Sequence, residues 1–144
     1  MKNALHLLSG AAMAALAFLL RALGGWDAAL MLMLLMMGLD LVSGLILSFQ
    51  RRSAKTRGGF DSGTMFLGLT RKLLMLLLVI LGTALDSLLG SGICRLAVIG
   101  FYSAGEALSV VENAALAGVP FPRGLLASLE RYRERLDRAG TGEE

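Results

Sequence analysis

Long apolar runs, separated by short polar segments, dominate the hydrophobic pattern of the chain. Residues 4–20 and 28–49 form the first two runs, which together contain one Asp, Glu, Lys or Arg residue, Asp40. Residues 73–90 and 96–111 form two further runs, of which the last is the shortest. A helix rises about 1.5 Å per residue, so runs of this length can cross roughly 30 Å of hydrocarbon. The pattern predicts an all-α polytopic membrane protein with three to four transmembrane helices.

Two of these runs have alternative interpretations. The first follows Lys2 and has the outline of a signal peptide, but it is long for one and Arg21 lies where a cleavage site would be. A retained helix is therefore the better interpretation. The run at 96–111 contains Glu106 and two glycines, so it either crosses the membrane or lies as a short helix at the interface.

A different pattern follows residue 115. Pro120 and Pro122 interrupt the apolar sequence, and apolar residues then recur at spacings of four, three and four, at Leu125, Leu129, Tyr132 and Leu136. This periodicity predicts an amphipathic helix, which either self-associates or lies on the membrane surface, or else is a soluble tail. The chain thus divides into a transmembrane domain, residues 1–115, and a cytoplasmic amphipathic tail, residues 116–144.

Composition strengthens the membrane assignment and narrows the chemistry. The chain is 56% hydrophobic and 17% charged, with a mean hydropathy of +0.68, which is far from the values of soluble domains. Cys94 is the single cysteine and His6 the single histidine, so we expect no cofactor and no metal site. The methionines at 31–37 occupy several helix faces and are expected to be apolar filler. No serine, cysteine or lysine has a base and an orienting partner nearby in sequence, so we expect no enzyme.

A basic segment separates the second run from the third and sets the predicted topology. Lys and Arg concentrate in cytoplasmic loops, so this segment predicts that the loop and both termini are cytoplasmic. Because aromatic residues are not interleaved with its cations, we interpret it as solvated surface or lipid-phosphate contact, not as a nucleic-acid site. Against one acid, Asp61, the segment carries Arg51, Arg52, Lys55, Arg57, Arg71 and Lys72.

Polar residues inside the apolar runs are the candidate functional residues. Asp40 lies near the predicted bilayer midplane, where a charged group costs about 2.5 to 3.5 kcal/mol, and it shares a helical face with Ser43 and Gly44. Asp86 lies nearer the outer end of its run, where interfacial water is an alternative partner. A polar stripe and its helix end comprise Tyr102, Glu106, Ser109, Glu112 and Asn113. We expect these residues to face other helices or a water-filled space.

The order of these features resembles the phage holins of the toxin-secretion and phage-lysis group. The resemblance covers roughly residues 28 to 130, and its most specific part is "EALSVVENAALAGVPFP" at 106–122. The longer "GGFDSGTMFLG" departs from the more compact lysine- and serine-rich loop of that group, which puts the role of this loop in doubt.

The resemblance implies a protein of the bacterial cytoplasmic membrane that forms homo-oligomers in the lipid bilayer and permeabilises it. The released cargo would be a cell-wall hydrolase, the endolysin, during host lysis, or a large toxin in some relatives. A membrane scaffold or accessory subunit that opens no hole is the leading alternative. A small transporter is a third, although the sequence has no inverted repeat to support it.

Overall fold

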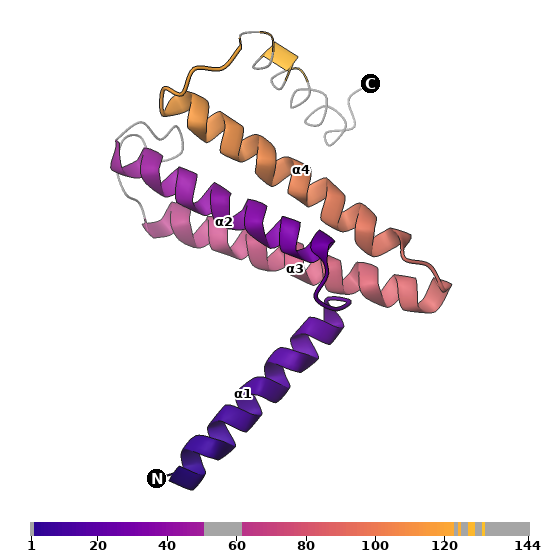
Figure 1. Ribbon diagram of the computed structural model, residues 1–144. Coiled ribbons are helices and arrows are strands. Elements are labelled where there is room, and N and C mark those ends of the chain that lie inside the picture. The colour runs from indigo at the N-terminus through magenta and orange to yellow at the C-terminus, as the bar shows by residue number, and fades with distance from the viewer. Residues whose placement is uncertain (1, 51–61, 123, 125–126, 129–130, 132–144) are drawn as a thin grey trace.

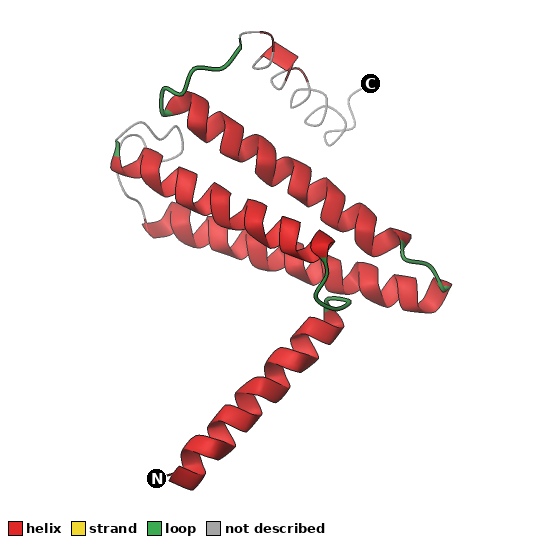
Figure 2. Cartoon of the chain, in the orientation of Figure 1, coloured by secondary structure: helices red, strands yellow, loops and turns green. Residues whose placement is uncertain are grey.

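The computed structural model describes residues 2–50, 62–122, 124, 127–128 and 131. Within that part of the chain the helices are α1 (Lys2–Ala22), α2 (Ala28–Phe49), α3 (Ser62–Leu89) and α4 (Ile93–Leu116), and the described residues include no strand (Figures 1 and 2). The predicted all-α class is confirmed.

Three of these helices are long and apolar enough to cross a membrane. The candidate spans are Ala28–Phe49 in α2, Met65–Leu89 in α3 and Ile93–Leu116 in α4. The apolar part of α1 is shorter and covers His6–Ala22 among the described residues. The apolar run at 96–111 therefore belongs to a longer helix, whose length and composition suit a span.

Helices α2, α3 and α4 lie side by side as a bundle, while α1 projects away from it (Figure 1). Helix α4 packs most extensively against α2 and next against α3. The core between them includes Leu30, Met33, Val79 and Ile99, each at most 2% exposed. Met33 and Met37 thus fill the core, as expected for flexible apolar side chains. Most of the remaining leucines are exposed on the outer surface of the helices, as expected for helices that lipid surrounds.

The ends of the helices have local causes. Asp27 caps α2, because its carboxylate accepts a hydrogen bond from the Leu30 amide at 2.9 Å. Helix α4 ends where Gly118 adopts a φ of +95°, and the amides of Gly118 and Val119 donate back to the carbonyls of the last turn. Pro120 then follows in extended chain.

Two regions singled out in the sequence fall largely outside the described residues. These are the predicted tail helix within 116–144 and the loop cations Arg51, Arg52, Lys55 and Arg57.

Candidate functional site

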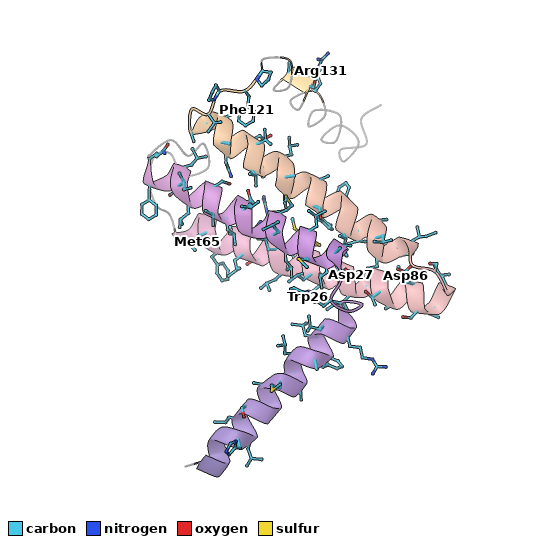
Figure 3. The ribbon with its side chains drawn as sticks, viewed as in Figure 1. Trp26, Asp27, Met65, Asp86, Phe121 and Arg131 are labelled. Carbon is cyan, nitrogen blue, oxygen red and sulfur yellow. The ribbon has the colours of Figure 1, made fainter. Side chains whose placement is uncertain are left out.

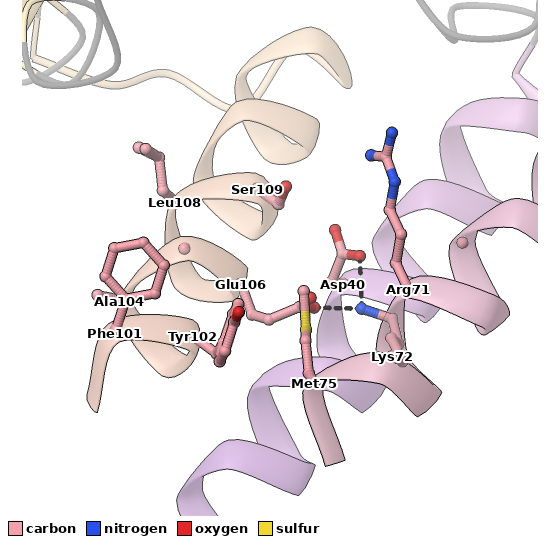
Figure 4. Close-up of a pocket in the computed structure, with 12 residues that line it drawn as sticks. Asp40, Arg71, Lys72, Met75, Phe101, Tyr102, Ala104, Glu106, Leu108 and Ser109 are labelled. Carbon is pink, nitrogen blue, oxygen red and sulfur yellow. Dashed lines mark hydrogen bonds and ion pairs between the residues drawn. The ribbon is translucent and has the colours of Figure 1, made fainter. Parts of the chain in front are cut away.

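One ammonium group joins two carboxylates inside the bundle. Lys72 Nζ of α3 donates to Asp40 Oδ2 of α2 at 2.9 Å and to Glu106 Oε2 of α4 (Figure 4). The three side chains are only 8%, 17% and 7% exposed, respectively. We call Asp40, Lys72 and Glu106 the charge cluster. It ties all three bundle helices together, and each acid obtains the counter-ion that an apolar surrounding demands.

An amide extends the charge cluster along the α2–α4 contact. Asn113 Nδ2 donates to Ser43 Oγ at 2.9 Å and to Asp40 Oδ1 at 3.3 Å, and Ser43 Oγ in turn donates to the Asp40 carbonyl. Gly44 lies beside this amide, since a Cβ there would sit 3.8 Å from Asn113 Nδ2. The polar face predicted on α2 and the polar stripe predicted on α4 therefore meet each other.

The structure corrects the expected position of two cations. The sequence placed Arg71 and Lys72 in the cytoplasmic loop, but both lie within α3, whose candidate span already begins at Met65. The loop assignment was wrong because the two cations interrupt the apolar pattern and hide the apolar residues before them. The sequence nevertheless contained a signal for the buried position of Lys72. Two acids in apolar runs require a cation at a similar depth, and Lys72 at the edge of a run was the available candidate.

The charge cluster and part of the polar stripe line a cavity of about 300 Å³ between α3 and α4. Tyr102 and Ser109 face it from α4, and Arg71 and Met75 from α3 (Figure 4). Glu112, one residue before Asn113, is half-buried on α4 and does not line the cavity. Four of the five polar residues predicted on α4, namely Tyr102, Glu106, Ser109 and Asn113, therefore lie at the charge cluster or around the cavity.

A second polar cluster lies at the opposite end of the bundle, where Figure 3 labels Asp27 and Asp86. Arg95, 9% exposed, donates to Asp27 Oδ2 at 2.7 Å and Oδ1 at 3.1 Å, and its Nε donates to the Leu23 carbonyl at 2.7 Å. The hydrogen bond from Arg95, followed by the one from the Leu30 amide, lowers the pKa of Asp27 from 3.8 to about 2. These contacts hold the α1–α2 turn against the start of α4.

Asp86 caps the first turn of α4 from the neighbouring helix. Its carboxylate accepts from the amides of Cys94 and Arg95, both at 2.9 Å, and from Ser91 Oγ at 2.8 Å. The residue is 8% exposed, and its partners are two backbone amides and the hydroxyl of Ser91. A carboxylate at a helix N-terminus stabilises the unpaired amides there.

The chemistry available here is charge pairing and hydrogen bonding between helices. Among the described residues, no group of three or more His, Cys, Asp or Glu is placed to hold a metal ion. Each contact of the charge cluster joins two different helices.

Comparison with known proteins gives the family. The sequence profile of the bacteriophage holin family matches residues 17–134. The chain belongs to the bacteriophage holin family. Among its relatives is a probable holin of Bacillus phage phi105, 33% identical over 92 residues, which cover 63% of this holin and 64% of the relative.

Two bacterial relatives are also similar. An uncharacterized 14.9 kDa protein from the nagH 3' region of Clostridium perfringens is 30% identical over 114 residues, or 78% of this holin and 82% of the relative. YqxH of Bacillus subtilis is 30% identical over 108 residues, or 72% and 73%. No solved structure matches the chain. Family membership and three long apolar helices together make this chain a holin-like membrane protein, related to phage lysis, with its charge cluster inside the matched region.

Proposed function

We propose that this holin permeabilises the bacterial cytoplasmic membrane as a homo-oligomer, so that an endolysin can reach the cell wall. The observation that carries the proposal is the charge cluster. Its polar groups lie inside a bundle whose outer surface is apolar, and its contacts all run between helices. An arrangement of this kind has two stable environments, protein partners and water, but not lipid.

In the proposed closed form, the charge cluster stays paired inside each bundle. In the single chain, Asp40, Lys72 and Glu106 satisfy one another and leave little polar surface exposed to lipid. If copies accumulate and their bundles associate, separation of α4 from α3 turns the same groups toward a shared, water-filled space. The change exchanges ion pairs for hydration, so crowding of copies can shift the balance between the two forms.

The proposed orientation rests on the loop between α2 and α3. Two of the six cations that the sequence assigned to the loop, Arg71 and Lys72, lie in α3. The other four cations remain in the segment with one acid, Asp61. That excess still favours a cytoplasmic loop, and it places the C-terminal end of α4 on the same side. If α1 also crosses, the N-terminus returns to the cytoplasm.

Cysteine labelling tests this orientation. Single cysteines at Ser53 and Gly140, with Cys94 replaced, are expected to resist an impermeant thiol reagent added outside intact spheroplasts. Strong labelling at either position before lysis would show that the orientation is inverted.

Induced expression in a bacterium tests the function. We expect loss of membrane potential, read with a voltage-sensitive dye, followed by release of a co-expressed endolysin. Glu106→Gln removes one carboxylate partner of Lys72 and is expected to insert and oligomerise but to delay or abolish release. Arg21→Gln, on the exposed end of α1, is the matched control.

The outcomes separate the possibilities when protein levels are matched. Wild-type release times in Glu106→Gln would remove the charge cluster from the mechanism and leave the permeabilising activity standing. No depolarisation and no release by the wild-type chain would instead favour a membrane scaffold.

A further inference from the structure

We propose that Arg71 and the cavity between α3 and α4 bind one membrane phospholipid, with the guanidinium on its phosphodiester and an acyl chain in the cavity. Arg71 lines the cavity and is exposed, and it has no ion-pair partner among the described residues. In Figure 4 its guanidinium points away from Asp40 and Lys72, toward the end of the bundle where α3 begins.

The depth of Arg71 suits a headgroup. Arg71 follows Met65, the first residue of the candidate span, by six residues, or about 9 Å along the helix axis. Side chains on a helix lean toward its N-terminus, and α3 begins at this surface, so the long side chain of Arg71 is directed outward. Extension of that side chain brings the guanidinium to the phosphate level, as is usual for arginines near the ends of spans.

The cavity is kept open by glycines that do not serve helix packing. A Cβ built on Gly82 of α3 would lie 3.0 Å from the Arg95 Cα, which shows a glycine used for close helix contact. Gly68 of α3 and Gly105 of α4 line the cavity, yet a Cβ on either would have no atom within 4 Å. These two glycines leave the space beside them unfilled by protein, and an acyl chain of the bilayer is the proposed occupant.

The walls of the cavity match both parts of a phospholipid. Phe101, which is 60% exposed, Leu108 and Met75 form apolar walls, and the hydroxyls of Tyr102 and Ser109 lie on the α4 side. The charge cluster also lines the cavity, so the acyl chain is proposed to lie against the apolar walls and not against these charged groups. A volume of about 300 Å³ falls at the lower end of the range of small-ligand pockets. The cavity therefore holds part of one chain and not a whole lipid.

The charges favour a singly charged phosphodiester. A guanidinium binds two phosphate oxygens in parallel, which gives the interaction direction as well as charge. The charge cluster has two carboxylates for one ammonium and so carries a formal charge of about −1 behind Arg71. This residual charge repels multiply charged anions more than it repels a phosphodiester, so we expect free phosphate to bind worse than lipid.

Native mass spectrometry of the full-length protein, released from detergent micelles, tests the proposal. The probes are phosphatidylglycerol, phosphatidylcholine, diacylglycerol and inorganic phosphate. We expect retention of both phospholipids by the wild type, and about a tenfold weaker apparent affinity in Arg71→Gln, because a charge-assisted contact is lost. Gly105→Leu fills the cavity and is expected to weaken lipid retention similarly.

Matched controls separate these effects from general ones. Arg21→Gln removes an exposed cation elsewhere, and Gly100→Leu adds the same side chain to α4 at a position that has no atom within 4 Å but does not line the cavity. Both controls are expected to bind lipid as the wild type does, and circular dichroism checks that all four variants keep their helix content.

Several results would overturn the proposal. Equal lipid retention in Arg71→Gln or in Gly105→Leu would do so, as would retention of diacylglycerol as strong as that of phosphatidylglycerol. Inorganic phosphate bound as tightly as lipid would indicate a free-anion site. A changed oligomer mass in Gly105→Leu without loss of lipid would show that a second copy of the chain occupies the cavity. None of these readouts depends on lysis, so the result is independent of the proposed function.

Discussion

Replacing Lys72 with methionine tests how much the charge cluster stabilises the bundle. Methionine keeps an unbranched, flexible side chain but removes the ammonium, so Asp40 and Glu106 lose their shared counter-ion. Removing one partner of a buried ion pair costs about 3–5 kcal/mol. Two charge-assisted hydrogen bonds of about 1.5–3 kcal/mol each give a similar range. We therefore expect the free energy of unfolding to fall by about 3–5 kcal/mol.

Titration with a denaturing detergent in mixed micelles, followed by circular dichroism, measures this change. The triple variant Lys72→Met, Asp40→Asn, Glu106→Gln removes all three charges and is expected to recover to within about 1–2 kcal/mol of the wild type, because no unpaired charge stays buried. Arg21→Met, at the exposed end of α1 and away from the cavity, is the control and should change stability by no more than about 0.5 kcal/mol.

Two results would refute this reasoning. A loss below about 1 kcal/mol in Lys72→Met would mean that water reaches the carboxylates and that the cluster is not buried in the folded protein. Failure of the triple variant to recover would mean that Lys72 acts through packing of its methylene groups and not through its charge.

Four further substitutions test other contacts and glycine positions in the bundle. Asp27 has a folded pKa of about 2, below its ordinary 3.8, so its contact with Arg95 contributes stability above about pH 4, and this contribution is lost as the pH falls toward 2. Between pH 4 and pH 2, the free energy of unfolding of Asp27→Asn should therefore change less with pH than that of the wild type. An equal pH dependence in the two proteins would contradict the pairing. Gly82→Ala should cost about 1–3 kcal/mol, because its Cβ would meet backbone at 3.0 Å, whereas Gly38→Ala, with open space, should be neutral or stabilising by up to about 1 kcal/mol in the same titration. Asn113→Ala should cost about 1 kcal/mol, and no change would show that its amide contacts do not hold α4 to α2.

Much of the fold was predictable because each helix carries its own signal. The apolar runs located the bundle helices, and the polar face around Asp40 and the stripe through Glu106 were expected to avoid lipid. The boundary of α3 was not predictable in the same way. Arg71 and Lys72 interrupt hydropathy, and only a buried partner on another helix makes it favourable for the span to continue through Lys72.

The sequence did not predict which residues the polar side chains contact. Nothing in the spacing of α4 indicates that Glu106 shares a lysine with α2, or that Arg95 reaches Asp27, 68 residues earlier in the chain. Likewise, Asp86 reads as a residue near an interface until the α3–α4 turn places it under the first amides of α4. These contacts depend on the relative register of helices, which periodicity along one helix does not encode.

The sequence by itself determined that this chain is helical, lies in a membrane and turns its polar side chains inward, because the cost of exposing polar groups to hydrocarbon acts on every helix separately. Tertiary structure decided which charges pair and where a cavity opens. Those outcomes depend on distances of a few ångströms between helices, set by close contact at Gly82 and by empty space at Gly68 and Gly105. A glycine thus allows close helix contact at one level and borders open space at another, and only the packing of neighbouring helices distinguishes the two cases.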